Sequence, residues 1–123
     1  MLNCFVVGAG GFIGAVLRYL IGLVPVKETT VFPVKTLMIN ITGCIMIGCI
    51  AALTVKNTSL NPKWILFLKT GICGGFTTFS TFALESADLV KAGHMGMAVL
   101  YVILSIVAGI GAVFAAEFLV DRY

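Results

Sequence analysis

Residues 71–82 combine side chain types that are unusual inside a hydrophobic segment. The stretch reads Gly-Ile-Cys-Gly-Gly-Phe-Thr-Thr-Phe-Ser-Thr-Phe, with three glycines, four hydroxyl side chains and three phenylalanines. Within a bilayer, irregular and hydroxyl-rich backbone persists only where it is buried in protein or lines a water-filled cavity. Broken helices of this kind hold the ion sites of many membrane transport proteins. The alternative is a continuous helix whose glycines and hydroxyls serve close packing.

Four other polar side chains interrupt apolar segments, and each has two interpretations. Arg18 is close to a segment end, where it is either an interface anchor or a charge that attracts anions. Asn40 lies about one turn inside its segment, so its amide must bond another helix or a ligand. Tyr101 and Ser105 are four residues apart and share a helical face, as core packing or as hydroxyl donors.

The composition defines the class of protein that must position these side chains. The 123 residues are 60% hydrophobic and 11% charged, and the mean hydropathy is +1.14. A soluble domain of this size could not bury so much apolar surface. Because a membrane-spanning helix takes about 20 apolar residues, we predict an all-α integral membrane protein with one domain over residues 1–123. Its four helices are expected over residues 3–24, 36–55, 64–90 and 95–119.

Several classes of function have no support in the sequence. The four cysteines all lie in apolar segments: Cys4, Cys44, Cys49 and Cys73. Their spacing matches neither a zinc site nor a disulfide framework. The single histidine, His94, falls in a turn, and no nucleophile and base pair is visible, so we predict that the protein is not an enzyme. No basic run indicates a nucleic-acid partner.

Positive charges are balanced between the two sides of the predicted membrane domain. The side of the termini has Lys56, Lys63, Lys69 and Arg122, and the opposite side has Arg18, Lys27, Lys35 and Lys91. A chain of fixed orientation carries excess Lys and Arg on its cytoplasmic side. The balance therefore predicts insertion in both orientations and pairing of two opposite copies about a two-fold axis.

The motifs together resemble those of the Fluc (CrcB) fluoride channels. The matching segments are residues 10–19, which read Gly-Gly-Phe-Ile-Gly-Ala-Val-Leu-Arg-Tyr, Asn-Ile-Thr-Gly at 40–43, and residues 71–82 with Glu85 after them. The similarity covers all four predicted helices in order, and the run from Gly74 to Phe82 is the most specific part. The resemblance implies a dual-topology homodimer in the bacterial inner membrane that exports fluoride passively through two antiparallel pores and so lowers fluoride toxicity. It also implies that the third helix breaks near its middle.

The resemblance assigns roles to particular residues. It implies a structural sodium ion at the dimer centre, held by the backbone carbonyls of Gly74 and Thr77 from both subunits. It implies a fluoride pore with a vestibule charge at Arg18. The pore residues that it implies are Asn40, Phe79, Phe82, Ser80, Thr81, Tyr101, Ser105 and Glu85. These groups suit fluoride, because amide and hydroxyl donors and the positive edges of aromatic rings can replace its water.

One departure and two alternatives accompany this interpretation. The family carries hydroxyls along the fourth helix, but the position after Tyr101 and Ser105 on that face is Gly109. A small multidrug exporter would need an acidic residue in the first helix, which holds Arg18 instead. A structural subunit without transport activity would explain the glycines as packing residues but not the threonine and phenylalanine run.

Overall fold

The computed structural model describes residues 1–25 and 31–122, and regular structure in these ranges is entirely helical. The helices are α1 (Leu2–Gly22), α2 (Val34–Lys56), α3 (Pro62–Ile65), the π-helical η1 (Leu66–Cys73), α4 (Gly74–Phe76), α5 (Phe79–Lys91) and α6 (Met95–Arg122). Lys27, which entered the charge balance, lies outside the described residues. The predicted helical class and the predicted break in the third helix are both confirmed, since α4 and α5 are separated at Thr77 and Thr78.

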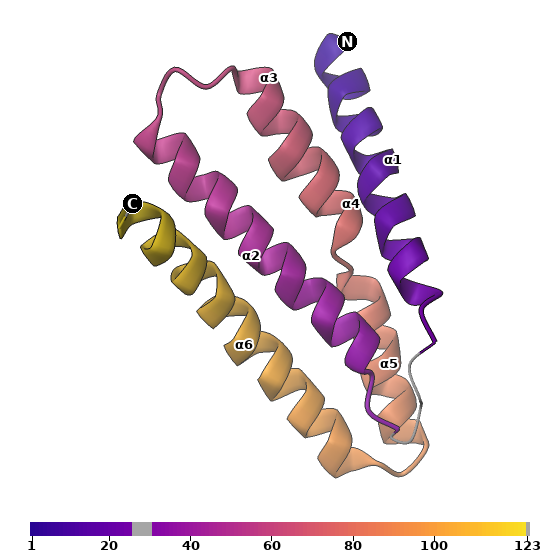
Figure 1. Cartoon of the computed structure of the whole chain (residues 1–123). Helices are drawn as coiled ribbons and strands as arrows, with labels where there is room; N and C mark the ends of the chain where they lie inside the picture. Colours follow the sequence, from indigo (N-terminus) through magenta and orange to yellow (C-terminus); the bar gives the residue numbers. More distant parts are fainter. Residues whose placement is uncertain (26–30, 123) are drawn as a thin grey trace.

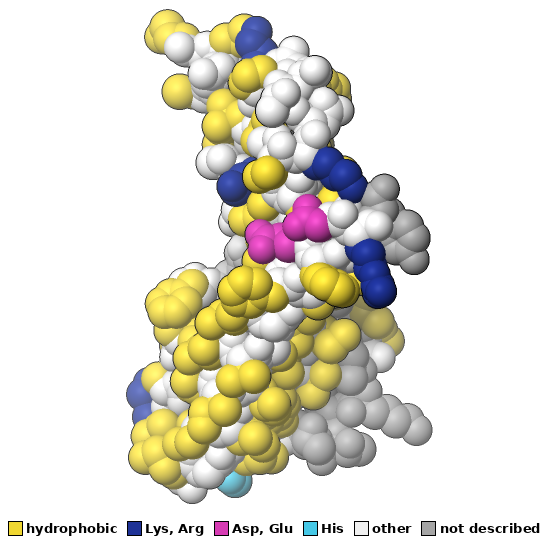
Figure 2. Space-filling view, turned by 90° about the vertical axis from the view of Figure 1, so that its left-hand side faces the viewer, with side chains coloured by type: hydrophobic (Ala, Val, Ile, Leu, Met, Phe, Trp, Pro, Cys, Tyr) yellow, Lys and Arg dark blue, Asp and Glu magenta, His cyan; other side chains and the backbone are white. Residues whose placement is uncertain are grey.

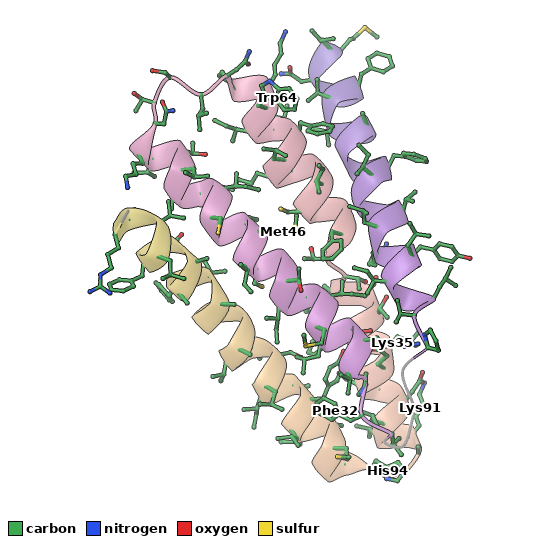
Figure 3. The ribbon with its side chains drawn as sticks, viewed as in Figure 1. Phe32, Lys35, Met46, Trp64, Lys91 and His94 are labelled. Carbon is green, nitrogen blue, oxygen red and sulfur yellow. The ribbon has the colours of Figure 1, made fainter. Side chains whose placement is uncertain are left out.

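Four membrane spans arise from these elements. Within the described residues, α1, α2, the run Pro62–Lys91 and α6 are each long and apolar enough to cross a bilayer. The protein is therefore a multi-pass membrane protein. Both termini lie at the same end of the bundle as the α2–α3 connection (Figure 1). Trp64 marks that end, and Lys91 and His94 mark the opposite one (Figure 3).

Local sequence signals explain where the third span starts and stops. Pro62 occupies the first helical turn, and the Asn61 side chain accepts a hydrogen bond from the Lys63 backbone N–H, as expected of a helix cap. After α5 the chain turns at Gly93, whose φ of +83° is a conformation that favours glycine. This turn leads directly into α6.

Glycines bring α1 into backbone contact with the third span. Gly10 and Gly14 are buried, and a Cβ at Gly10 would lie 2.9 Å from the Gly71 Cα. A Cβ at Gly14 would lie 2.8 Å from the Phe76 backbone nitrogen. Gly10 and Gly14 thus form a small-residue face that allows close helix contact.

The remaining helices pack in a second layer beside this pair. Figure 1 shows α2 between α6 and the third span. A Cβ at Gly48 of α2 would lie 2.9 Å from the Cβ of Ala116 on α6, so small residues permit close approach here too. A small buried cluster of Leu89, Ala98 and Tyr101 joins α5 to α6.

Most large apolar side chains point outward, as expected of a protein whose solvent is lipid. Phe5, Phe12, Ile103 and Phe114 are all exposed. Figure 2 shows one face of the molecule, with hydrophobic side chains over its lower part and acidic and basic side chains grouped higher up. Packing inside the protomer therefore rests on small residues and on a few polar contacts.

Candidate functional site

The break in the third span is held open by Asn40. Thr77 and Thr78 have extended backbone, with ψ values of 157° and 110°. Asn40 Nδ2 donates to the Thr78 carbonyl at 3.1 Å, and Asn40 Oδ1 accepts from the Thr78 N–H at 2.8 Å. One side chain of α2 therefore satisfies both backbone groups of Thr78 at membrane depth.

These contacts remove the helical partners of two backbone carbonyls. In a continuous helix the Gly74 carbonyl would accept from the Thr78 N–H, but that N–H donates to Asn40. The Thr77 carbonyl would accept from the Thr81 N–H, which instead donates to the Thr78 hydroxyl at 3.2 Å. Thr78 thereby caps α5, and the carbonyls of Gly74 and Thr77 are left without their usual partners.

Arg18 lies on the other side of the break from Asn40. Its Nε donates to the Gly75 carbonyl at 3.2 Å, which ties α1 to the end of α4. Within the protomer, this guanidinium is thus a hydrogen-bond donor to the backbone at the break. Sequence reasoning missed this role because the acceptor is a backbone carbonyl, which the type of side chain does not reveal.

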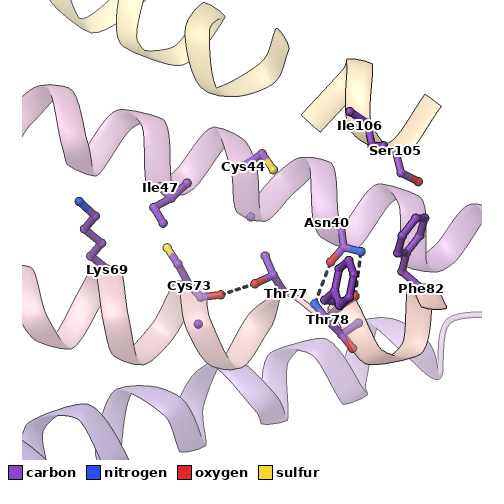
Figure 4. A pocket seen from close by; sticks show the side chains of 13 residues that line it. Asn40, Cys44, Ile47, Lys69, Cys73, Thr77, Thr78, Phe82, Ser105 and Ile106 are labelled. Atoms are coloured by element: carbon purple, nitrogen blue, oxygen red, sulfur yellow. Dashed lines mark hydrogen bonds between the residues drawn. The ribbon is translucent and has the colours of Figure 1, made fainter. Parts of the chain in front are cut away.

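A groove of about 390 Å³ runs along the break between α2, the third span and α6. Its lining includes Asn40, Gly43, Cys44, Ile47, Lys69, Cys73, Gly74, Thr77, Thr78, Phe79, Phe82, Ser105 and Ile106. Figure 4 shows Lys69 at one end of this groove and Phe82 with Ser105 at the other. The groove therefore passes the break and connects a charged end to an aromatic end.

Two phenylalanines form the aromatic end. The ring centroids of Phe79 and Phe82 are 5.7 Å apart with an interplanar angle of 47°. Phe79 is 80% exposed in the protomer, whereas Phe82 packs with its centroid 5.1 Å from that of Tyr101. Tilted rings of this kind can turn positive ring edges toward an anion.

A carboxylate with two hydroxyl donors lies behind the aromatic end. Thr36 Oγ1 donates to Glu85 Oε1 at 2.7 Å, and the Tyr101 hydroxyl donates to Glu85 Oε2 at 2.8 Å. Tyr101 is fully buried. The three residues come from α2, α5 and α6, so the network fixes the relative positions of these helices.

We expect Tyr101→Phe to lower thermal stability measurably. The substitution keeps the ring packing but leaves Glu85 Oε2 without its donor, and a hydrogen bond to a charged group is worth about 1.5–3 kcal/mol. The check is the midpoint of thermal unfolding in detergent. Tyr19→Phe is the matched control because Tyr19 is 65% exposed, and equal midpoints for the two variants would contradict the network.

Known proteins resemble this chain over most of its length. The family model described as "CrcB-like protein, Camphor Resistance (CrcB)" matches residues 5–117. The chain belongs to the CrcB family. It is 42% identical over 120 residues to the "Fluoride-specific ion channel FluC" of Azobacteroides pseudotrichonymphae, covering 97% of this chain and 96% of the relative.

Other CrcB relatives give the same result. The protein of the same name from Chlorobium phaeobacteroides is 46% identical over 104 residues, which are 85% of this chain and 81% of the relative. The protein of that name from Ruminiclostridium cellulolyticum is 48% identical over 107 residues, 86% of this chain and 82% of the relative. The family is thus one of ion channels and not of enzymes.

The structure brings together part of the pore set implied by the CrcB resemblance. Asn40, Phe79, Phe82 and Ser105 line the groove. The Ser105 Oγ is buried and has no hydrogen-bond partner among the described residues. A buried hydroxyl without a partner is costly unless water or a ligand reaches it.

The other implied pore residues do not line the groove. Ser80 is exposed at the start of α5, and the Thr81 hydroxyl accepts from Thr78 Oγ1 at 2.9 Å. Tyr101 directs its hydroxyl to Glu85. Their pore roles remain predictions.

Two residues of the site were not anticipated from the sequence. Thr36 stands near the start of a helix, and the sequence does not distinguish it from other hydroxyl residues there. Lys69 was counted only as one of the charges near the termini. At Gly109, the departure from the family pattern, a Cβ would lie 3.4 Å from Cys44 Sγ, a contact that does not by itself require glycine.

Proposed function

We propose that this protein is a fluoride-selective channel that lets the anion leave the cell passively and so lowers fluoride toxicity. The observation that carries the proposal is the geometry of Asn40. Its Nδ2 has two N–H donors, of which one bonds the Thr78 carbonyl. The second has no partner among the described residues, and the side chain lines the groove.

The chemistry of the groove fits a small, strongly hydrated anion. The second Asn40 N–H and the unpartnered Ser105 hydroxyl are uncharged donors. The N-terminal end of α5 adds partial positive charge beside them. Uncharged donors bind an anion weakly enough for it to leave again, which conduction requires.

A second copy of the chain in the opposite orientation completes the groove in this proposal. The phenyl group of Phe79 is 80% exposed at the groove wall, and Gly74 is exposed at the break. A pore open along its side to lipid would leave polar groups unsatisfied. An antiparallel homodimer in the bacterial inner membrane covers these groups and accounts for the balanced lysines and arginines.

The carbonyls of Gly74 and Thr77 fit a structural sodium ion at the centre of such a dimer. Both lack their helical N–H partners, and carbonyl oxygens suit a hard cation. A bound sodium ion would supply positive charge to four oxygens, two from each subunit. Asn40 and Thr78 would orient these oxygens by holding Thr77 and Thr78 extended at the end of α4.

Removal of sodium is expected to destabilise the dimer. A ligand that binds only the assembled state adds about 2.7 kcal/mol of stability at a concentration 100 times its dissociation constant. The measurement is the thermal midpoint and dimer fraction in sodium, compared with N-methyl-D-glucamine at equal ionic strength. A midpoint that does not change when sodium is titrated back would count against the site.

Anion efflux from liposomes tests the proposed function. Purified protein is reconstituted, voltage is clamped with a potassium ionophore, and fluoride and chloride are followed with selective electrodes. We expect rapid fluoride release without chloride release. Release of neither ion from well-folded protein would overturn the proposal and favour a structural subunit.

A further inference from the structure

Lys69 is a charged side chain within a membrane span. It lies in η1, seven residues after Pro62, and is therefore about 10 Å along the helix at 1.5 Å per residue. Its side chain is exposed and has no hydrogen-bond or ion-pair partner among the described residues. An unpaired ammonium at this depth is unfavourable in lipid, so the side chain needs a water-accessible site within the span.

The groove is that site. Lys69, Cys73 and Thr77 follow one another at intervals of four residues and line the same wall. Of the described residues that line the groove, Lys69 alone carries a charge. Because helical side chains lean toward the helix N-terminus, the ammonium group is directed away from the break and toward the end of the span (Figure 4).

We propose that Lys69 is the positive charge at the mouth of the groove, where it attracts fluoride from water toward Asn40. The inference rests on the proposed function and adds a residue that governs anion entry. Charge in a cleft with low-dielectric walls concentrates counter-ions and raises entry rates by about 10-fold or more. The part of the groove around Asn40 and Ser105 can then stay uncharged, which keeps release fast.

Arg18 does not fill this role within the protomer. Its Nε is bonded to the Gly75 carbonyl, and the residue is absent from the described lining of the groove. Lys63, the neighbouring lysine of α3, lies instead beside a separate apolar groove with Phe5 and Trp64. Lys63 is thus a matched control at the same end of the same span.

A charge series at residue 69, measured as initial fluoride efflux at two ionic strengths, tests the inference. At roughly 10 mM salt, where the Debye length is about 30 Å, we expect Lys69→Arg to match the native rate. Lys69→Gln should lose about half of it, because entry falls about 10-fold only in the one of two antiparallel pores that fluoride enters at this mouth. Lys69→Glu should be slower still. At roughly 1 M impermeant salt, with a Debye length of about 3 Å, the native, Gln and Glu rates should converge. Lys63→Gln should follow the native protein at both ionic strengths.

The outcomes separate this inference from the proposed function. If native protein releases no fluoride, the channel proposal itself fails. If native protein conducts but Lys69→Gln is as fast as native, or slower by a factor independent of salt, the entry role is wrong. Native efflux that does not fall as ionic strength rises would also overturn it, and that measurement needs no variant to fold.

Discussion

Asn40→Asp protein is expected to assemble with reduced stability, since the Thr78 carbonyl loses its donor, and to release fluoride about 1000-fold more slowly than the native chain. Aspartate keeps an oxygen for the Thr78 N–H, which Asn40 Oδ1 accepts at 2.8 Å. It loses both amide donors and adds a negative charge to the groove wall. Two like charges 4 Å apart at an effective dielectric constant of 20 repel by about 4 kcal/mol, which corresponds to that factor in rate. Liposome efflux gives the rate, and size-exclusion chromatography gives the assembly state.

Asn57→Asp is the control for Asn40→Asp. Asn57 Oδ1 also accepts a backbone N–H, from Ser59 at 3.1 Å, but its side chain is exposed after α2. The same added charge should leave efflux unchanged there. Asn40→Ala should also abolish efflux, with an additional loss of about 1–3 kcal/mol of stability from the unsatisfied Thr78 groups. Normal fluoride release through Asn40→Asp or Asn40→Ala would remove Asn40 from the pathway.

Gly14→Ala is expected to prevent correct packing of α1. The added methyl group would meet the Ile72 carbonyl oxygen and lie 2.8 Å from the Phe76 nitrogen and 3.1 Å from the Gly75 carbonyl carbon. These are backbone atoms, so relief requires α1 to shift away from the third span. Overpacking of this kind costs about 1–3 kcal/mol or more, and the shift would also separate Arg18 from the Gly75 carbonyl.

The measurement for Gly14→Ala is the yield of monodisperse protein and its thermal midpoint in detergent. Gly8→Ala is the matched control on the same helix, since a Cβ at Gly8 has nothing within 4 Å. We expect Gly8→Ala to equal or slightly exceed native stability, because alanine is the better helix former. Equal behaviour of the two variants would show that the contact between α1 and the third span tolerates separation.

The fold was largely predictable because lipid imposes strong constraints. Four apolar segments of spanning length follow from hydropathy, and residues 71–82 contain too many glycines and hydroxyls for an ordinary lipid-facing helix. Asn40 was identifiable because an amide inside a span must have a partner. Its two bonds to Thr78 confirm the interhelical interpretation, and its role in conduction stays a prediction.

Hydrogen bonds to backbone carbonyls and the orientation of hydroxyl groups could not be predicted from the sequence. The Gly75 carbonyl as partner of Arg18 depends on where the helix breaks relative to α1. Tyr101 and Ser105 share a face of α6, yet the hydroxyl of Tyr101 bonds Glu85 while that of Ser105 has no partner among the described residues. The difference arises from the length of the two side chains and the position of α5, neither of which a spacing of four residues reveals.

The permanent break in the third span has a consequence for the temperature dependence of transport. Asn40, Arg18 and the Thr78 hydroxyl bond Thr78, the Gly75 carbonyl and the Thr81 N–H from within the protomer, and the carbonyls of Gly74 and Thr77 are left for the proposed sodium ion. The third span is therefore unwound once, when the chain folds, and the free-energy cost of unwinding does not recur each time an ion crosses. Passage then needs only exchange of hydration for side chain donors, so its activation enthalpy should stay near that of diffusion in water. A carrier that must rock its helices in every cycle would slow far more steeply on cooling.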